Sequence, residues 1–203
     1  TVEAIVVDEG KITFVGNTTD ALKQKAEGTL VKDLGGKTLM PGFIDGHAHA
    51  QQFGTQAVGA NLLAPPDGAV NTVDDLVASL KTFAVGPDVA LTGWIFGMGY
   101  DDALLGRHPT RADLDKVSTT VPVMATHISG HFAAVNTLGL QMIGYDAGTA
   151  NPEGGVIRRE ADGKTPNGVL EELAAMPYMV KSLAPTTQAG KDYFLKRGLE
   201  LAK

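Results

Sequence analysis

Residues 39–50 read LMPGFIDGHAHA and place two histidines one residue apart, behind an apolar run that is broken by Pro-Gly. If residues 43–49 are extended, Asp45, His47 and His49 lie on one face, because side chains alternate along a strand. The two imidazoles are then roughly 6.5 to 7 Å apart and can converge on a single metal ion. A His-x-His pair also occurs at strand ends where both rings only hydrogen-bond to neighbours. Residues 39–50 alone leave both interpretations open.

Composition limits the classes of partner and of metal ligand. The chain has 203 residues and 17 basic against 23 acidic side chains, giving a net charge of -6. Because no run of Lys or Arg stands out, we expect no nucleic-acid or membrane partner. The absence of cysteine leaves His and carboxylate side chains as the ligands for a metal. No apolar run reaches the ~18 residues of a spanning helix, so we expect a soluble chain and favour the cytoplasm over export.

The first 40 residues predict a small β-sheet. Residues 2–16 contain two apolar runs around Glu9-Gly10, which indicates a hairpin. Residues 29–42 add short strand-like segments around Gly35-Gly36.

From residue 41 onward, predicted strands alternate with predicted helices, which is typical of a mainly parallel sheet. We expect strands at 90–99 and 121–127 and a hairpin at 154–170 that turns at Asp162-Gly163. We expect helices at 72–83, 111–117, 132–143, 171–183 and 186–203.

Single residues mark the starts of two of these helices and a break inside a third. Asn71 is the expected N-cap of helix 72–83, and Thr110 with Asp113 resembles a capping box. Pro177 is expected to kink or split helix 171–183.

Several blocks of the chain resemble one family. The first barrel strand of the metal-dependent amidohydrolase superfamily has an apolar run, Pro-Gly and Asp-x-His-x-His, matched here by Pro41, Gly42, Phe43, Ile44, Asp45, His47 and His49. Residues 93–102 (GWIFGMGYDD), 108–140 and 154–174 (GGVIRREADGKTPNGVLEELA) are similar to the amidohydrolase-3, or YtcJ-like, branch.

The resemblance implies an α/β fold, the first part of a (β/α)8 TIM-like barrel preceded by a small β-sandwich-type sheet. Residues 1–40 would be part of the small β-domain. Residues 41–203 would be the N-terminal part of the hydrolase barrel, with inserted helices and a hairpin. Because a complete barrel takes about 250 residues, we expect the chain to be an incomplete, N-terminal fragment.

The resemblance also implies site residues. His47 and His49 would be metal ligands, and Glu172 would be a further ligand from the family block GVL-x-E, unless it is only a helix N-terminal glutamate. His127 would end a strand and His131 would begin the next helix, at the rim where α/β barrels build their sites. His131, within the family block GH...VN, would line the substrate pocket or make a structural hydrogen bond, and His127 is a second pocket candidate. His108 is expected to be solvated.

The implied function is metal-dependent hydrolysis of a non-peptide, amide-type carbon–nitrogen bond in a small molecule. One or two divalent ions, with zinc favoured, would activate water and polarise the carbonyl. In the superfamily two later histidines and a catalytic aspartate complete the site, so we expect no catalytic residue in this chain and an inactive fragment. The alternative is a non-catalytic domain that binds metal weakly or forms a homo-oligomer through exposed sheet edges.

Overall fold

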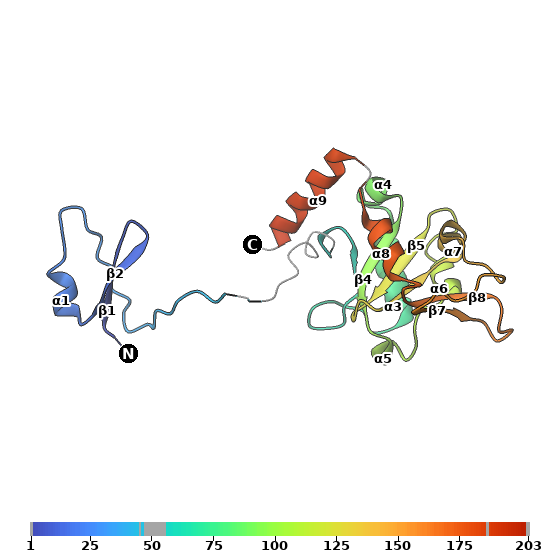
Figure 1. Cartoon of the computed structure of the whole chain (residues 1–203), viewed down its shortest axis with the longest axis horizontal. Coiled ribbons are helices and arrows are strands. Elements are labelled where there is room, and N and C mark those ends of the chain that lie inside the picture. Colours follow the sequence, from blue (N-terminus) through green and yellow to red (C-terminus); the bar gives the residue numbers. More distant parts are fainter. Residues whose placement is uncertain (1, 45, 47–55, 186, 202–203) are drawn as a thin grey trace. The chain divides into compact units, whose positions relative to one another are not determined.

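The computed structural model describes residues 2–44, 46, 56–185 and 187–201. The chain divides into two compact units, residues 1–46 and residues 47–203 (Figure 1). Among the described residues, none of the helices combines the length and the apolar character needed to cross a membrane.

The N-terminal unit contains the predicted hairpin. Strands β1 (Ala4–Asp8) and β2 (Lys11–Gly16) pair antiparallel. The turn residues Glu9 and Gly10 have φ values of 45° and 75°, which match the right-handed twist of a hairpin. Helix α1 (Thr18–Leu22) follows and buries none of its residues.

The prediction of short strands within residues 29–42 was wrong, because these residues form one turn, at Gly35-Gly36, and otherwise irregular chain. Gly35 and Gly36 both have positive φ, and Lys37 donates its backbone N–H to the carbonyl of Leu34 three residues earlier. Local hydrogen bonds of this kind replace the ladder that a strand requires. The sheet of the described N-terminal residues therefore has only the two strands β1 and β2.

The second unit is built on a six-stranded sheet with the order β3-β4-β5-β6-β8-β7. The strands are β3 (Ala60–Asn61), β4 (Ile95–Tyr100), β5 (Val123–His127), β6 (Phe132–Val135), β7 (Gly155–Arg159) and β8 (Pro166–Glu172). Strands β3, β4 and β5 are parallel, β6 is antiparallel to both β5 and β8, and β7 is antiparallel to β8. The fold is thus mixed α/β, and β4, β5 and β8 run in the same direction.

Seven helices are described in this unit, and Figure 1 labels them along the chain. They are α3 (Val73–Ala84), α4 (Val89–Thr92), α5 (Asp102–Leu105), α6 (Arg111–Asp115), α7 (Thr137–Ile143), α8 (Met176–Leu183) and α9 (Gln188–Leu201). The Thr110–Asp113 capping box is confirmed at α6. The N-cap of α3 is Thr72, which forms a capping box with Asp75, so the prediction of Asn71 was one residue too early.

Three predicted elements differ from the structure in type. Residues 132–135 form strand β6, and only the segment after Asn136 is helical. Residues 90–92 belong to helix α4 rather than to the strand that follows. Glu171 and Glu172 end strand β8, and Pro177 lies in the first turn of α8, where it leaves the helix unkinked.

The sheet of the second unit is covered on both faces. Alternate residues of β4 and β5 point to opposite sides, because the side-chain period of a strand is two. Ile95 and Val123 pack with Leu76, Leu80 and Leu114 from α3 and α6. On the other face, Phe96 and Met124 pack with Leu170, with Leu140 from α7 and with Tyr178 from α8. The two clusters together fix the sheet and therefore the positions of its strand ends.

The β7–β8 hairpin confirms the predicted turn at Asp162-Gly163. The Asp162 carboxylate accepts hydrogen bonds from the backbone of Lys164 and Thr165 and from the Thr165 hydroxyl. Gly163 has a φ of 68°, which favours glycine.

Candidate active site at the carboxyl edge of the sheet

Strands β4, β5 and β8 end at one edge of the sheet, which we call the carboxyl edge. Tyr100 ends β4 and is paired with His127, the last residue of β5. Glu172 ends β8, and its neighbour Glu171 is paired with Phe132 at the start of the antiparallel strand β6. Ligands of α/β proteins generally bind at the carboxyl ends of the strands, so this edge is the candidate site.

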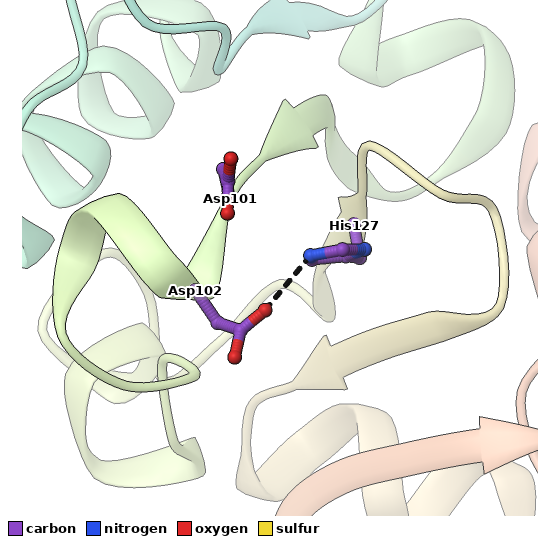
Figure 2. Close-up of side chains that lie close together, drawn as sticks. All are labelled: Asp101, Asp102 and His127. Atoms are coloured by element: carbon purple, nitrogen blue, oxygen red, sulfur yellow. Dashed lines mark ion pairs between the residues drawn. The ribbon is translucent and has the colours of Figure 1, made fainter.

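Two aspartates follow β4 directly and approach His127 from the neighbouring strand (Figure 2). The Nε2 atom of His127 is 2.9 Å from Oδ1 of Asp102, and the His127 side chain is 11% exposed. Asp101 caps α5 by accepting the backbone N–H of Ala103 at 2.9 Å. One ligand atom from each of Asp101, Asp102 and His127 lies within 4.8 Å of the others. This cluster has a spacing at which a metal ion could be held.

His108 lies against the same cluster and is largely buried, so the prediction of a solvated histidine was wrong. Its side chain is 10% exposed, and its Nε2 atom is 3.6 Å from Oδ2 of Asp102. Its Nδ1 atom is 3.0 Å from the hydroxyl oxygen of Tyr100. The rings of His108 and His127 both pack against Phe132, with centroids 5.1 and 5.5 Å away.

The pKa shifts of His108 and Tyr100 favour the neutral imidazole and the neutral hydroxyl. Burial lowers the pKa of His108, and the nearby Asp102 only partly offsets that effect. Burial, followed by the charge of Asp102, raises the pKa of Tyr100 well above its ordinary value. The Tyr100 hydroxyl therefore stays protonated and can donate to Nδ1 of a neutral His108, whose Nε2–H then faces Asp102.

A second pair joins the two remaining candidates. The Nδ1 atom of His131 is 2.9 Å from Oε2 of Glu172, and the two side chains are 53% and 47% exposed. The backbone N–H of Glu172 also donates to the carbonyl of His131 at 2.8 Å. His131 precedes strand β6 rather than a helix, and Glu172 ends a strand, so the helix N-terminal interpretation of Glu172 was wrong.

Strand β6 separates the two histidine–carboxylate pairs. Neighbouring strands lie about 4.8 Å apart, so the backbones of His127 and Glu172, two strands apart in the sheet, are about 10 Å from each other. Arg158 of β7 lies over the ring of Phe132 on β6 and donates to Glu171 at 2.5 Å. The carboxyl edge thus carries two neighbouring polar subsites with a cation beside them.

The predictions for this edge have mixed outcomes. His127, His131 and Glu172 all lie there, but the structure does not test their roles. His47 and His49 fall outside the described residues, so their role as metal ligands stays a prediction. Asp101, Asp102 and His108 were missed, although two carboxylates directly after an apolar strand were a usable signal.

A mixed α/β sheet with imidazoles and carboxylates at its carboxyl edge does not define a function by itself, so the class of protein comes from comparison with known proteins. The profile of the amidohydrolase family matches residues 30–201. The chain belongs to this family, as the resemblance of the sequence blocks predicted.

Three similar proteins illustrate the relationship. The exoenzymes regulatory protein AepA of Pectobacterium carotovorum subsp. carotovorum is 35% identical, over 86% of this chain and 37% of its own length. The N-substituted formamide deformylase of Arthrobacter pascens is 31% identical, over 85% of this chain and 31% of its own length. The crystal structure of an uncharacterized metal-dependent hydrolase from Pyrococcus furiosus has a TM-score of 0.59 and 25% identity, covering 98% of this chain and 37% of that one. The chain therefore spans about a third of the length of these relatives.

Proposed function

We propose that a protein containing this chain is a metal-dependent hydrolase of non-peptide, amide-type carbon–nitrogen bonds in small molecules. Membership of the amidohydrolase family supports this class of reaction. The observation that carries the proposal is the carboxyl edge, where the His131–Glu172 pair and, two strands away from Glu172, His127 lie at the ends of strands that a packed core holds in place. The similarity to the N-substituted formamide deformylase supports a small amide as the substrate.

The donor atoms at this edge suit a divalent ion. Imidazole nitrogen and carboxylate oxygen are ligands of zinc and related ions, and the chain offers no thiolate. We propose His47, His49 and Glu172 as ligands for one or two ions, with zinc favoured. Glu172 fits this role because its carboxylate is half exposed and is held by His131 rather than by a strong cation. Bound zinc would supply a water with a pKa near ~7 and would polarise the substrate carbonyl.

The chain's own residues would orient the reactants. His131 donates from Nδ1 to Glu172 and so fixes the direction of that carboxylate. Its ring is half exposed, which leaves Nε2 able to contact a substrate oxygen. Arg158, which lies over the Phe132 ring and is paired with Glu171, would add a positive charge to this edge. The proton-transferring aspartate is proposed to lie outside these 203 residues, so we propose no turnover for the chain by itself.

The test is an assay of N-substituted formamides with the polypeptide encoded by the whole reading frame, and with the 203-residue chain beside it. We expect the long form to release formate and amine, to lose turnover with a chelator and to regain it with Zn²⁺. The variants His47→Ala and Glu172→Gln should lower turnover at least about 100-fold, while the matched exposed control Glu27→Gln should not. Chelator-insensitive turnover, or unchanged turnover in both site variants, would refute the proposal.

A second candidate is a non-catalytic, regulatory or oligomerising role. The relative with 35% identity is named a regulatory protein, and the hairpin of the N-terminal unit leaves Val7, Ile12 and Val15 exposed on open strand edges. This role predicts a dimer of the 203-residue chain in sedimentation that Ile12→Ser dissociates. A monomer at high concentration would remove the oligomerising form of this candidate.

A further inference from the structure

We propose that Asp102, His127 and Ser129 are positioning residues, which together hold the turn after strand β5 and thereby fix His131 against Glu172. The inference rests on the proposed function for its effect on turnover, because Glu172 is proposed there as a metal ligand. Its structural part concerns hydrogen bonds of the 203-residue chain and is measured without turnover.

The His131–Glu172 pair needs support from its surroundings. The two side chains are 53% and 47% exposed, and exposed pairs of this kind contribute little to stability. Their 2.9 Å contact is therefore too weak to hold two rotatable side chains in one direction by itself. The direction of the His131 ring depends on where the backbone of residue 131 is held.

That backbone is held on both sides. The backbone N–H of His131 donates to Oγ of Ser129 at 3.2 Å, and its carbonyl accepts the backbone N–H of Glu172 at 2.8 Å. Gly130, whose φ is 74°, donates its backbone N–H to the carbonyl of His127 at 3.0 Å and closes the turn. Ser129 is thus the link between the turn and His131.

The ring of His127 holds Ser129 in this turn. Its Nδ1 atom is 2.8 Å from Oγ of Ser129 and 3.1 Å from the backbone nitrogen of Ser129. A backbone N–H can only donate, so Nδ1 carries no proton and acts as the acceptor. The Ser129 hydroxyl can donate to the same nitrogen while its oxygen accepts from His131. A proton on Nδ1 would face the N–H of Ser129 and would open the turn.

Asp102 selects the tautomer that the turn requires. With Nδ1 bare, the ring proton lies on Nε2, which is paired with Oδ1 of Asp102 at 2.9 Å (Figure 2). The His127 side chain is only 11% exposed, so water does not readily take the place of the carboxylate. A hydrogen bond at one ring nitrogen generally decides which of the two nitrogens carries the proton. Asp102, after β4, therefore acts through His127 and Ser129 on the residue that contacts Glu172.

The first test is nitrogen NMR of His127 in the 203-residue chain at pH 8, above the ordinary imidazole pKa of about 6.5. We expect the Nε2–H tautomer. Asp102→Asn, whose amide can donate to Nε2, should introduce the Nδ1–H form. An Nδ1–H tautomer in the parent chain, or the same tautomer in parent and Asp102→Asn, would overturn the role given to Asp102.

Hydrogen exchange of the His131 backbone amide measures the link through Ser129. Ser129→Ala should speed this exchange about tenfold or more. The matched control is Ser118→Ala, which removes a hydroxyl that accepts backbone N–H groups in the turn between α6 and β5. It should leave the exchange of His131 unchanged. Equal exchange rates in the two variants would contradict the link.

Two substitutions of His127 separate its two nitrogens. The amide oxygen of His127→Asn takes the place of Nδ1 and can still accept from Ser129, whereas the amide of His127→Gln reaches toward Asp102 and leaves Ser129 without its acceptor. In the polypeptide encoded by the whole reading frame, His127→Gln should lower kcat about tenfold or more at unchanged KM. His127→Asn should keep most of its kcat, and the reverse order would overturn the proposal.

A double-substitution cycle completes the test, with folding of every variant checked by circular dichroism. Asp102→Asn should speed exchange of the His131 amide in the parent chain but not in the His127→Asn background, where the acceptor no longer depends on a tautomer. An equal effect in both backgrounds would contradict action through His127. Lack of turnover in the long form would refute the proposed function alone, because the NMR and exchange results decide this inference by themselves.

Discussion

Glu172 combines an unfavourable backbone with a candidate role. Its φ of 49° lies in the left-handed region, which costs a non-glycine residue about 1 kcal/mol or more. That conformation ends strand β8 at the point where the carboxylate meets His131. Strained residues of this kind concentrate at functional sites, which agrees with the proposal that Glu172 serves chemistry rather than stability.

Replacing Glu172 by glycine tests whether the backbone is strained at this position. We expect Glu172→Gly to change the free energy of unfolding by less than about 0.5 kcal/mol, because relief of the strained φ offsets the lost His131 pair. Glu171→Gly, which breaks the ion pair with Arg158 in an extended strand, should cost at least about 1 kcal/mol. Denaturant unfolding of the two variants measures this difference. Equal losses in both would show that the Glu172 backbone is not strained.

Asp113 should make stability depend on acid pH. Burial alone would raise its pKa, but hydrogen bonds from Arg107, at 2.6 and 3.0 Å, and from Thr110 lower it below the ordinary value. Because the folded pKa lies below the unfolded value of about 3.9, the stabilisation is complete above about pH 5 and is lost as pH falls through the folded pKa.

Asp113→Asn should therefore cost about 2 kcal/mol at pH 7 and much less near pH 2. Denaturant titrations at several pH values check this dependence, with the exposed Asp67→Asn as the control. A cost that stays constant with pH would mean that the carboxylate charge contributes nothing.

At the residue scale, the sequence predicted that His127 and His131 lie near the carboxyl edge, but it predicted neither their partners nor the position of His108. His131 and Glu172 are 41 residues apart, and only the pairing of β6 with β8 brings them together. His108 follows a polar loop, so nothing local indicated that the hydroxyl of Tyr100 and the ring of Phe132 would bury it. Such contacts depend on strand register, which a single sequence does not specify.

At the element scale, the boundary of helix α3 offers a prediction with a matched control. The Thr72 hydroxyl accepts the backbone N–H of Asp75, and the Asp75 carboxylate accepts the backbone N–H of Thr72. Thr72→Ala should destabilise the chain by about 1 kcal/mol. Asn71→Ala should cost less than about 0.5 kcal/mol, because the Asn71 side chain does not cap the helix. Thermal unfolding of both variants decides which residue is the cap, and a larger cost for Asn71→Ala would contradict the assignment.

Strand β6 shows why some elements could not be predicted. Phe132–Val135 is only four residues long and is followed directly by a true helix, so its apolar residues extend the helical pattern of 137–143 backward. The strand forms because it pairs on both sides, with β5 and with β8. Asn136 then ends it, since its buried side chain bonds the backbone of Val123 and caps α7. Elements with local signals, such as the β7–β8 turn and the α6 capping box, were predicted correctly.

At the scale of the whole molecule, the two units should differ in local stability. The second unit contains two buried clusters, whereas the described strands of the N-terminal unit form one hairpin with exposed apolar side chains. A two-stranded hairpin is at best marginally stable alone. Hydrogen exchange should therefore find slow amides in β4, β5, β6 and β8 and fast amides in β1 and β2. Amides in β1 and β2 that exchange as slowly as those of β5 would contradict this expectation.

The turn at Asp162-Gly163 also has a consequence for the order of events during folding. A hairpin such as β7–β8 closes in about 1–10 μs, because its partners are near neighbours along the chain. Pairing β6 with β8, or β4 with β5, requires closing longer loops and is entropically slower. The aspartates that follow β4 and the glutamates that end β8 would consequently come onto one edge only as these slower strand pairs form. The repulsion between these carboxylates would then act against strands that already bury apolar side chains, rather than against an open chain.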